Sequence, residues 1–207
     1  MPDPEQDRDA ARADLCRLLA ACYYEPGPEF EEERVFAALR AAAARVDPGL
    51  AADARRLGDA FAAARLEDLL IDYTRLFLGP VAAPARPYGS VWLEADKGLM
   101  QDSTMAVLAL YAEGGFEIAE AFRELPDHIA AELEFLYLLL FRAAQARRAG
   151  DDATLAAAAD LRKRFLEAHL AAWVGPFTAA VAANAQTDFY RALAQLTERF
   201  IGTESRA

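Results

Sequence analysis

The two histidines are the residues with the widest choice of chemistry, as metal ligands or as acid–base groups. His128 and His169 stand 41 positions apart, and neither completes a Glu-x-x-His pattern, so the paired motif of di-iron helical bundles is missing. Glu124, His128 and Glu132 would share one side of a helix at i, i+4 and i+8, which leaves metal binding as a minor alternative. His169 lies in an apolar stretch, where we expect a packed, hydrogen-bonded side chain. We predict no metal site.

Nucleophilic and phosphate-binding patterns are also missing. Cys16 and Cys22 lack Cys-x-x-Cys spacing, and six residues of helix would separate them by about 9 Å, beyond the reach of a disulfide. The chain has no Gly-x-Ser-x-Gly elbow, no Walker-type phosphate loop and no Gly-x-Gly-x-x-Gly turn. Asp127 and His128 are adjacent and could act as an acid–base pair. A helical metal or Asp-His enzyme is therefore the alternative, and the prediction is that the chain is not an enzyme.

Composition indicates an all-α protein. The 207 residues include 49 alanines but only 18 valines, isoleucines and threonines, and alanine is the best helix former. The net charge of −11 argues against nucleic acid as a partner, because phosphate binding needs clustered Lys and Arg. The polar start of the chain shows no signal peptide. The most weakly charged stretch, 168–186, is interrupted by Gly175-Pro176, so we expect a cytoplasmic protein without stable membrane insertion.

Proline, glycine and aspartate divide the chain into about ten helices of a single compact domain. An irregular loop is expected at 79–92 and a central buried helix at 126–149, where the run LEFLYLLLF is apolar nearly all round. Helices at 7–78 precede this loop, and helices at 95–201 follow it around a hinge at 124–128. The expected helices are 7–24, 29–45, 50–65, 66–78, 95–113, 116–123, 126–149, 152–173, 176–185 and 187–201.

Charge is concentrated in the segment that holds both the loop and the central helix. Residues 66–141 carry 13 acidic and 4 basic groups, a net charge of −9. A solvated acidic face is one interpretation of this imbalance. The other is an electric field that steers a cationic ligand towards the loop.

Two segments carry a family resemblance. Residues 72–94 read DYTRLFLGPVAAPARPYGSVWLE, and residues 124–135 read ELPDHIAAELEF. Their order, with Leu-Phe, Gly-Pro, Pro-aromatic-Gly-Ser and Pro-Asp-His, resembles the TorD/DmsD family of redox-enzyme maturation chaperones, most closely its DmsD-like branch. Weaker agreement extends the resemblance over about residues 70–200. One departure is Leu125, where the family often has an acidic residue.

The resemblance implies an all-helical cytoplasmic chaperone without a cofactor of its own. Its partner would be the twin-arginine leader and apo catalytic subunit of a molybdenum oxidoreductase, whose export is delayed until molybdopterin guanine dinucleotide is loaded into that client. The family includes domain-swapped members, so either a monomer or a swapped dimer is expected. The alternative within the same resemblance is a nitrate-reductase-type assembly chaperone with a non-exported client. The residues that the resemblance assigns to leader binding are Tyr73, Leu76, Phe77, Pro87, Tyr88, Trp92, Glu94, Pro126, Asp127 and His128.

Side-chain chemistry suggests roles for these residues. Carboxylates at Asp127, Glu94 and Asp72 could hold guanidinium groups. Tyr88 and Trp92 offer aromatic faces for cation–π contact, while Leu76 and Phe77, with Val91, could cover an apolar stretch. Titration of His128 would make binding pH-sensitive. Leu76 and Phe77 could instead be core residues, and Asp127 could be only a charge in the first turn of a helix.

Overall fold

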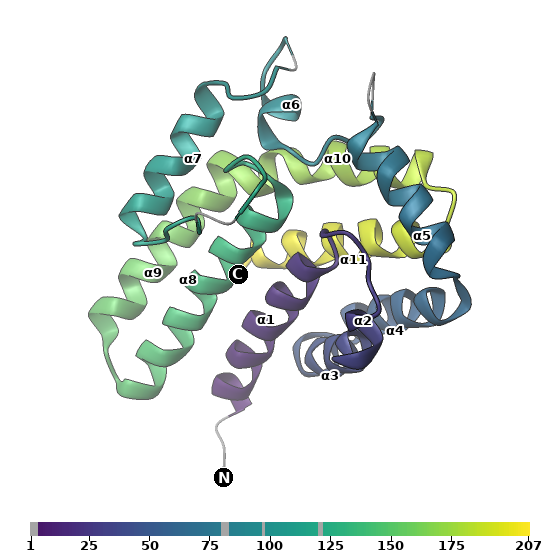
Figure 1. Ribbon diagram of the computed structural model, residues 1–207. Coiled ribbons are helices and arrows are strands. Elements are labelled where there is room, and N and C mark those ends of the chain that lie inside the picture. The colour runs from purple at the N-terminus through teal and green to yellow at the C-terminus, as the bar shows by residue number, and fades with distance from the viewer. Residues whose placement is uncertain (1–3, 80–82, 97, 120–121) are drawn as a thin grey trace.

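The computed structural model describes residues 4–79, 83–96, 98–119 and 122–207, and over these ranges it is helical without any strand (Figure 1). One isolated antiparallel bridge pairs Tyr88 with His128. The predictions of an all-α fold and a single compact domain are confirmed. The elements are α1 (Pro4–Ala21), α2 (Glu29–Glu32), α3 (Val35–Val46), α4 (Pro48–Ala63), α5 (Leu66–Tyr73), the π-helical turn η1 (Thr74–Leu78), α6 (Gly89–Leu93), α7 (Asp102–Glu113), α8 (Ile129–Ala149), α9 (Asp152–Phe165), the π-helical turn η2 (Leu166–Leu170), α10 (Ala171–Asn184) and α11 (Asp188–Glu204).

Helix α8 is the central element, as its apolar sequence predicts. It packs against α1 on one side and α9 on the other, and Leu133, Phe135 and Leu136 are completely buried. The helix begins at Ile129 instead of Pro126, because His128 is its N-cap: its Nδ1 accepts a hydrogen bond from the Ala130 N–H at 3.1 Å. The correction moves Pro126 and Asp127 out of the helix and into the segment that precedes it.

Several other predicted helices are wrong at their ends. The helix expected at 29–45 is divided at Arg34, whose left-handed backbone (φ 54°) separates α2 from α3. The helix expected at 95–113 begins only at Asp102, after Met100 with φ 57°. Residues 116–119 and 122–123 are not helical, because Gly115 (φ 60°) turns the chain and Phe116 packs on Tyr111. The expected loop at 79–92 is helical from Gly89 onward, where α6 begins.

The break expected at Gly175-Pro176 is absent. Helices α9 and α10 join through η2 into one continuous stretch, Asp152–Asn184, with Pro176 inside α10. By length and composition this stretch could cross a membrane, but half of its apolar window is buried inside the protein. Core helices pass the same test, and Trp173 and Phe177 are fully buried. The stretch is therefore weak evidence for a membrane span.

A buried ionic network joins the two ends of the described chain. Arg12 on α1 donates two hydrogen bonds to the Glu204 carboxylate on α11, at 2.8 Å and 2.6 Å. Arg162 on α9 donates a third to Glu204 at 3.2 Å. Glu204 is almost completely buried, so the network fixes α1, α9 and α11 to one another.

Candidate functional site

The two segments that carry the family motifs lie side by side. The Gly89 N–H donates to the carbonyl of Asp127, and the Ile129 N–H donates to the carbonyl of Pro87, both at 2.8 Å. The Tyr88–His128 bridge lies between these two bonds. The structure therefore brings Pro87 and Tyr88 together with Asp127 and His128, as expected of loop and Pro-Asp-His segments that face each other.

Asp127 is completely buried and acts as a structural cap. Its Oδ2 accepts a hydrogen bond from the Ser90 N–H at 2.8 Å, which satisfies an otherwise unpaired donor in the first turn of α6. The interpretation of Asp127 as a charge at a helix start is therefore right in kind, but the helix it caps is α6 and not α8. Its position beneath α6 keeps it away from solvent in this conformation.

A second buried carboxylate, Glu132, lies beneath α6. Its Oε2 accepts a hydrogen bond from the Trp173 indole N–H at 3.1 Å, and burial raises the pKa of Glu132. A Cβ atom on Gly89 would come within 3.1 Å of both groups, so glycine permits the close approach of α6. His169 is buried as expected, but its Nδ1 is 3.8 Å from Glu132 and has no hydrogen-bond partner within the described ranges.

His128 is buried among aromatic rings. Tyr24 stacks on it at a centroid distance of 6.4 Å, and Tyr88 meets it edge-on at 5.4 Å. Burial lowers the pKa of His128 from 6.5 to about 3, because the charged imidazolium would lose its hydration. The ring is therefore neutral between pH 6 and 8. This corrects the hypothesis that titration of His128 makes binding pH-sensitive in that range.

Three tyrosines and three glutamates form a cluster that includes Tyr24 and Tyr88, the two tyrosines in contact with His128. The Tyr88 hydroxyl donates to Glu124 Oε2 at 2.5 Å, and the Tyr24 hydroxyl donates to Glu134 Oε1 at 2.7 Å. Burial, followed by the charges of Glu124 and Glu25, raises the pKa of Tyr73 to about 12. We call this set the acidic tyrosine cluster; its members are Tyr24, Glu25, Tyr73, Tyr88, Glu124 and Glu134.

The acidic tyrosine cluster is suited to binding cations. In the described parts of the chain, Glu25, Glu124 and Glu134 form no ion pair with Lys or Arg. All members except the buried Tyr73 are at least partly exposed. Carboxylate oxygens bind guanidinium groups in two-point geometry, and tyrosine faces add cation–π attraction. The arrangement therefore presents negative charge and aromatic faces to a positively charged ligand.

The remaining predicted residues make contacts within the protein, and Phe77 also packs against Tyr73 of the cluster at a centroid distance of 5.3 Å. Leu76 and Phe77 belong to the core, where Phe77 packs against Tyr23, Phe177 and Tyr190. Trp92 donates its indole N–H to the Arg86 carbonyl at 2.9 Å. Glu94 accepts a hydrogen bond from the Ser103 N–H at 3.1 Å and so supports the start of α7. Pro126 offers its carbonyl to the Tyr111 hydroxyl.

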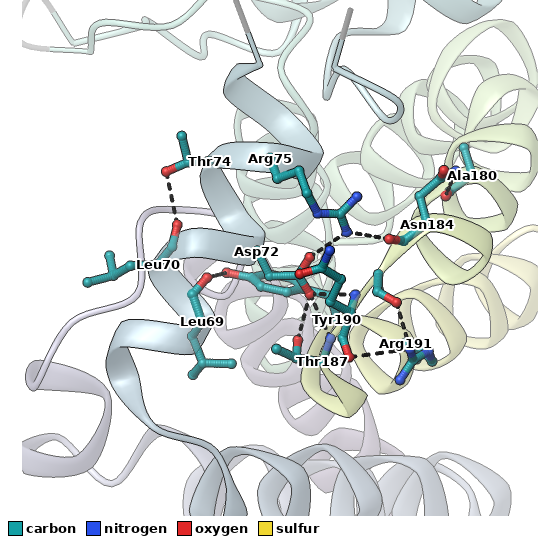
Figure 2. Close-up of polar contacts among 12 residues, drawn as sticks. Leu69, Leu70, Asp72, Thr74, Arg75, Ala180, Asn184, Thr187, Tyr190 and Arg191 are labelled. Atoms are coloured by element: carbon teal, nitrogen blue, oxygen red, sulfur yellow. Dashed lines mark hydrogen bonds and ion pairs between the residues drawn. The ribbon is translucent and has the colours of Figure 1, made fainter.

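Asp72 is also used within the protein (Figure 2). The figure shows its carboxylate between α5 and the start of α11, with Arg75 on one side and Thr187 on the other. Oδ1 accepts from Arg75 at 2.7 Å, while Oδ2 accepts from the backbone N–H groups of Gln186 and Thr187 and from the Thr187 hydroxyl at 2.8–2.9 Å. The guanidinium that Asp72 binds is therefore one of the protein's own.

Tyr24, Glu25 and Glu134 were not among the residues that sequence analysis selected. Each left a signal: Tyr24 and Glu25 lie after α1, just before Pro26-Gly27-Pro28, and Glu134 is a charge inside an apolar run. Their common location was not predictable, because Tyr24 and Glu134 are 110 positions apart and no motif links them. The carboxylates expected to hold arginine, Asp72, Glu94 and Asp127, are instead bonded within the protein.

Groups able to hold a metal ion are not assembled in the described parts of the chain. Cys16 and Cys22 are both free and buried, and burial raises the pKa of each thiol. Glu124 lies outside α8, so the helical i, i+4, i+8 alignment with His128 and Glu132 does not form.

The fold and the site together define an all-helical protein with a surface cluster of carboxylates and tyrosines. A family model described as the nitrate reductase delta subunit matches residues 43–179. The chain belongs to this family, which includes the TorD/DmsD redox-enzyme maturation chaperones.

Individual relatives agree with this assignment. The chain is 33% identical over 130 residues to the Tat proofreading chaperone DmsD of Salmonella typhi, a match that covers 63% of this chain and 57% of the relative. It is 27% identical over 213 residues to the chaperone protein TorD of Shewanella loihica, covering 95% and 92%. These relatives are named chaperones, in agreement with the prediction that the chain is not an enzyme.

The fold also matches a solved structure. A crystal structure of a candidate redox enzyme maturation protein from Archaeoglobus fulgidus aligns with a TM-score of 0.59, at 19% identity and over 92% of this chain and 93% of the other. At this identity the match supports the helical architecture alone.

Proposed function

We propose that this protein is a cytoplasmic chaperone that binds the twin-arginine leader of a molybdoenzyme catalytic subunit. Binding would delay export until the client has received molybdopterin guanine dinucleotide, and the chaperone would need no cofactor of its own. The single observation that carries the proposal is the acidic tyrosine cluster, which lies beside the paired motif segments and is rich in carboxylates without cationic partners within the described ranges. Family membership supports the same assignment.

The geometry of the cluster suggests how an arginine pair would bind. Glu124 and Glu134 each use one carboxylate oxygen for a tyrosine hydroxyl, which leaves the other oxygen for a guanidinium. Tyr24 and Tyr88 flank His128 from two sides, so their rings form the walls beside these carboxylates. Because His128 is neutral at physiological pH, it adds no positive charge to repel the ligand.

Affinity for the leader should be moderate, because the client must later be released. A micromolar dissociation constant corresponds to about −8 kcal/mol. Part of this energy would come from charge-assisted hydrogen bonds, each worth about 1.5–3 kcal/mol. Binding should therefore weaken at high salt, where exposed charges are screened.

Calorimetric titration with synthetic leader peptides tests the proposal. The double variant Glu124→Gln/Glu134→Gln should weaken binding at least 10-fold, because it removes two carboxylates but keeps oxygens that can accept from Tyr88 and Tyr24. A leader with both arginines replaced by lysine should also bind more weakly, since lysine cannot form two-point contacts. Glu198→Gln, on the exposed face of α11, is the matched control and should bind like wild type. Equal binding by the double variant would refute the proposal.

A second candidate function is assembly of a nitrate reductase that is not exported. The description of the matching family model favours it. Gentle purification of the tagged protein from its host, followed by mass spectrometry, separates the two functions by the client recovered. A subunit with a twin-arginine leader supports the first function, and a nitrate reductase subunit without one supports the second.

Size-exclusion chromatography with light scattering tests the expected choice between monomer and domain-swapped dimer.

A further inference from the structure

An apolar groove lies among four helices in the N-terminal part of the chain, α2 to α5. Residues of α2, α3, α4 and α5 and of the loops beside them line a groove with a volume of about 580 Å³. Its walls include Phe30, Phe36 and Phe61, whose rings are in mutual contact at centroid distances of 4.4–6.0 Å. Leu66 and Leu69 of α5 complete the apolar lining, and Leu66 is 37% exposed. A volume of this size lies within the range of about 300–1,000 Å³ that is typical of ligand pockets.

The groove adjoins the acidic tyrosine cluster through two connections. Leu69 lines the groove and Tyr73 belongs to the cluster; four residues apart on α5, they share one face of that helix about 6 Å apart along its axis. Gly27 also lines the groove, and Glu25 of the cluster precedes it by two residues. Leu69 and Tyr73 are buried, whereas Glu25 is exposed and Gly27 partly exposed, so a polypeptide leaving the cluster would reach the groove over the Glu25–Gly27 loop.

Charge differs between the two neighbouring regions. The groove lining contains one acidic residue, Glu31, and one basic residue, Arg34, and is otherwise apolar or small. The cluster carries three carboxylates that lack cationic partners in the described part of the chain. The combined surface is complementary to a segment with a positively charged start and an apolar continuation.

We propose that the groove between α2 and α5 binds the apolar stretch that follows the arginine pair of the same leader. This inference rests on the proposed function, because it requires the arginines to occupy the cluster. The leader is then held at two points: its guanidinium groups determine position and direction, and its apolar side chains replace water against the accessible lining at Phe61, Ala62 and Leu66. Because hydrophobic burial is insensitive to salt screening, the groove contributes the part of the affinity that remains at high salt.

Two exposed alanines that line the groove allow it to be blocked without disturbing the core. Ala62→Trp on α4 fills the cavity, and Ala37→Glu on α3 introduces a charge into the apolar lining. The matched controls are Ala63→Trp and Ala38→Glu, which change neighbouring exposed alanines outside the lining. Each groove variant should weaken binding of the natural leader at least 5-fold in calorimetric titration, whereas each control should bind like wild type.

A second peptide separates the groove from the cluster. In this peptide the arginine pair is kept, and the apolar stretch is replaced by serine and glycine of equal length. It should bind wild type more weakly than the natural leader does, and Ala62→Trp should not weaken it further.

Three outcomes would overturn the inference: equal binding of the two peptides to wild type, undiminished binding of the natural leader by both groove variants, or equal losses in the control variants. Any of these, together with weakened binding by Glu124→Gln/Glu134→Gln, would leave the proposed function intact. Normal binding by that double variant would reject the proposed function itself.

Discussion

His128 illustrates how one buried side chain links structure to solution behaviour. Its folded-state pKa is about 3, below the ordinary value of 6.5, so the unfolded chain binds a proton that the folded protein does not bind between these two values. The stability contributed by the neutral ring is complete above pH 6.5 and is lost as the pH falls. The loss is about 1.4 kcal/mol per pH unit, or about 2 kcal/mol at pH 5.

Denaturant unfolding at pH 7 and pH 5 checks this prediction with His128→Asn as the comparison. Asparagine keeps an acceptor for the Ala130 N–H, as a good N-cap should, but it does not titrate. The variant should therefore lose less stability than wild type between the two pH values. If the free energy of unfolding falls equally in wild type and in His128→Asn, groups other than His128 cause the sensitivity to acid.

At the level of single residues, sequence could predict the motifs but only part of their use. The family resemblance assigned Tyr88 and His128 to one site, and the two segments that contain them do form a backbone bridge. It could not show that Asp127 is buried beneath α6 or that Tyr24 binds Glu134 across 110 positions, because such contacts depend on how helices pack. Residue type indicated that carboxylates could bind guanidinium groups. Tertiary structure determined which of these carboxylates are not already bonded within the protein.

Asp72 controls how two helices meet. Its carboxylate satisfies the backbone N–H groups at the turn before α11 and also binds Arg75 (Figure 2). Asp72→Ala should lower the free energy of unfolding by about 2–4 kcal/mol, because it leaves these buried donors without an acceptor. Thermal and denaturant unfolding measure the effect.

The matched control for this prediction is Asp68→Ala. Asp68 lies on the same helix but is exposed, so its replacement should change stability by less than about 0.5 kcal/mol. Similar losses in the two variants would mean that the charge on α5, and not the hydrogen bonds of Asp72, stabilises the junction.

At the level of elements, long apolar helices were predictable and their ends were less so. The central helix was recognised because its sequence is apolar on all sides. Positions such as Arg34 and Met100 adopt left-handed backbone conformations that their residue types do not favour, so the breaks beside them were not foreseen. At Pro176 the error was the reverse: a break was predicted, but α10 continues through this proline because the helix is packed in the core.

At the scale of the whole molecule, the buried network of Arg12, Arg162 and Glu204 connects three helices, α1, α9 and α11. Replacing Glu204 with alanine leaves the guanidinium groups of Arg12 and Arg162 close to each other without the carboxylate that both of them bind. Glu204→Ala should therefore destabilise the protein by about 3–5 kcal/mol in denaturant unfolding. Glu198→Ala, on the exposed side of the same helix, should have little effect. A small effect of Glu204→Ala would show that hydrophobic packing alone holds α1, α9 and α11 together.

The bridge between Tyr88 and His128 has a consequence for how such proteins can vary in length. The chain leaves the bridge at Gly89 and returns to it at Asp127, so the ends of this excursion are fixed beside each other whatever lies between them. Because the entropy of closing a loop grows only slowly with its length, added residues in the connections around α7 would have a small energetic cost. Insertions and deletions in the connection between α6 and α7 can therefore be accommodated without displacing the acidic tyrosine cluster, because none of its six members lies in that connection.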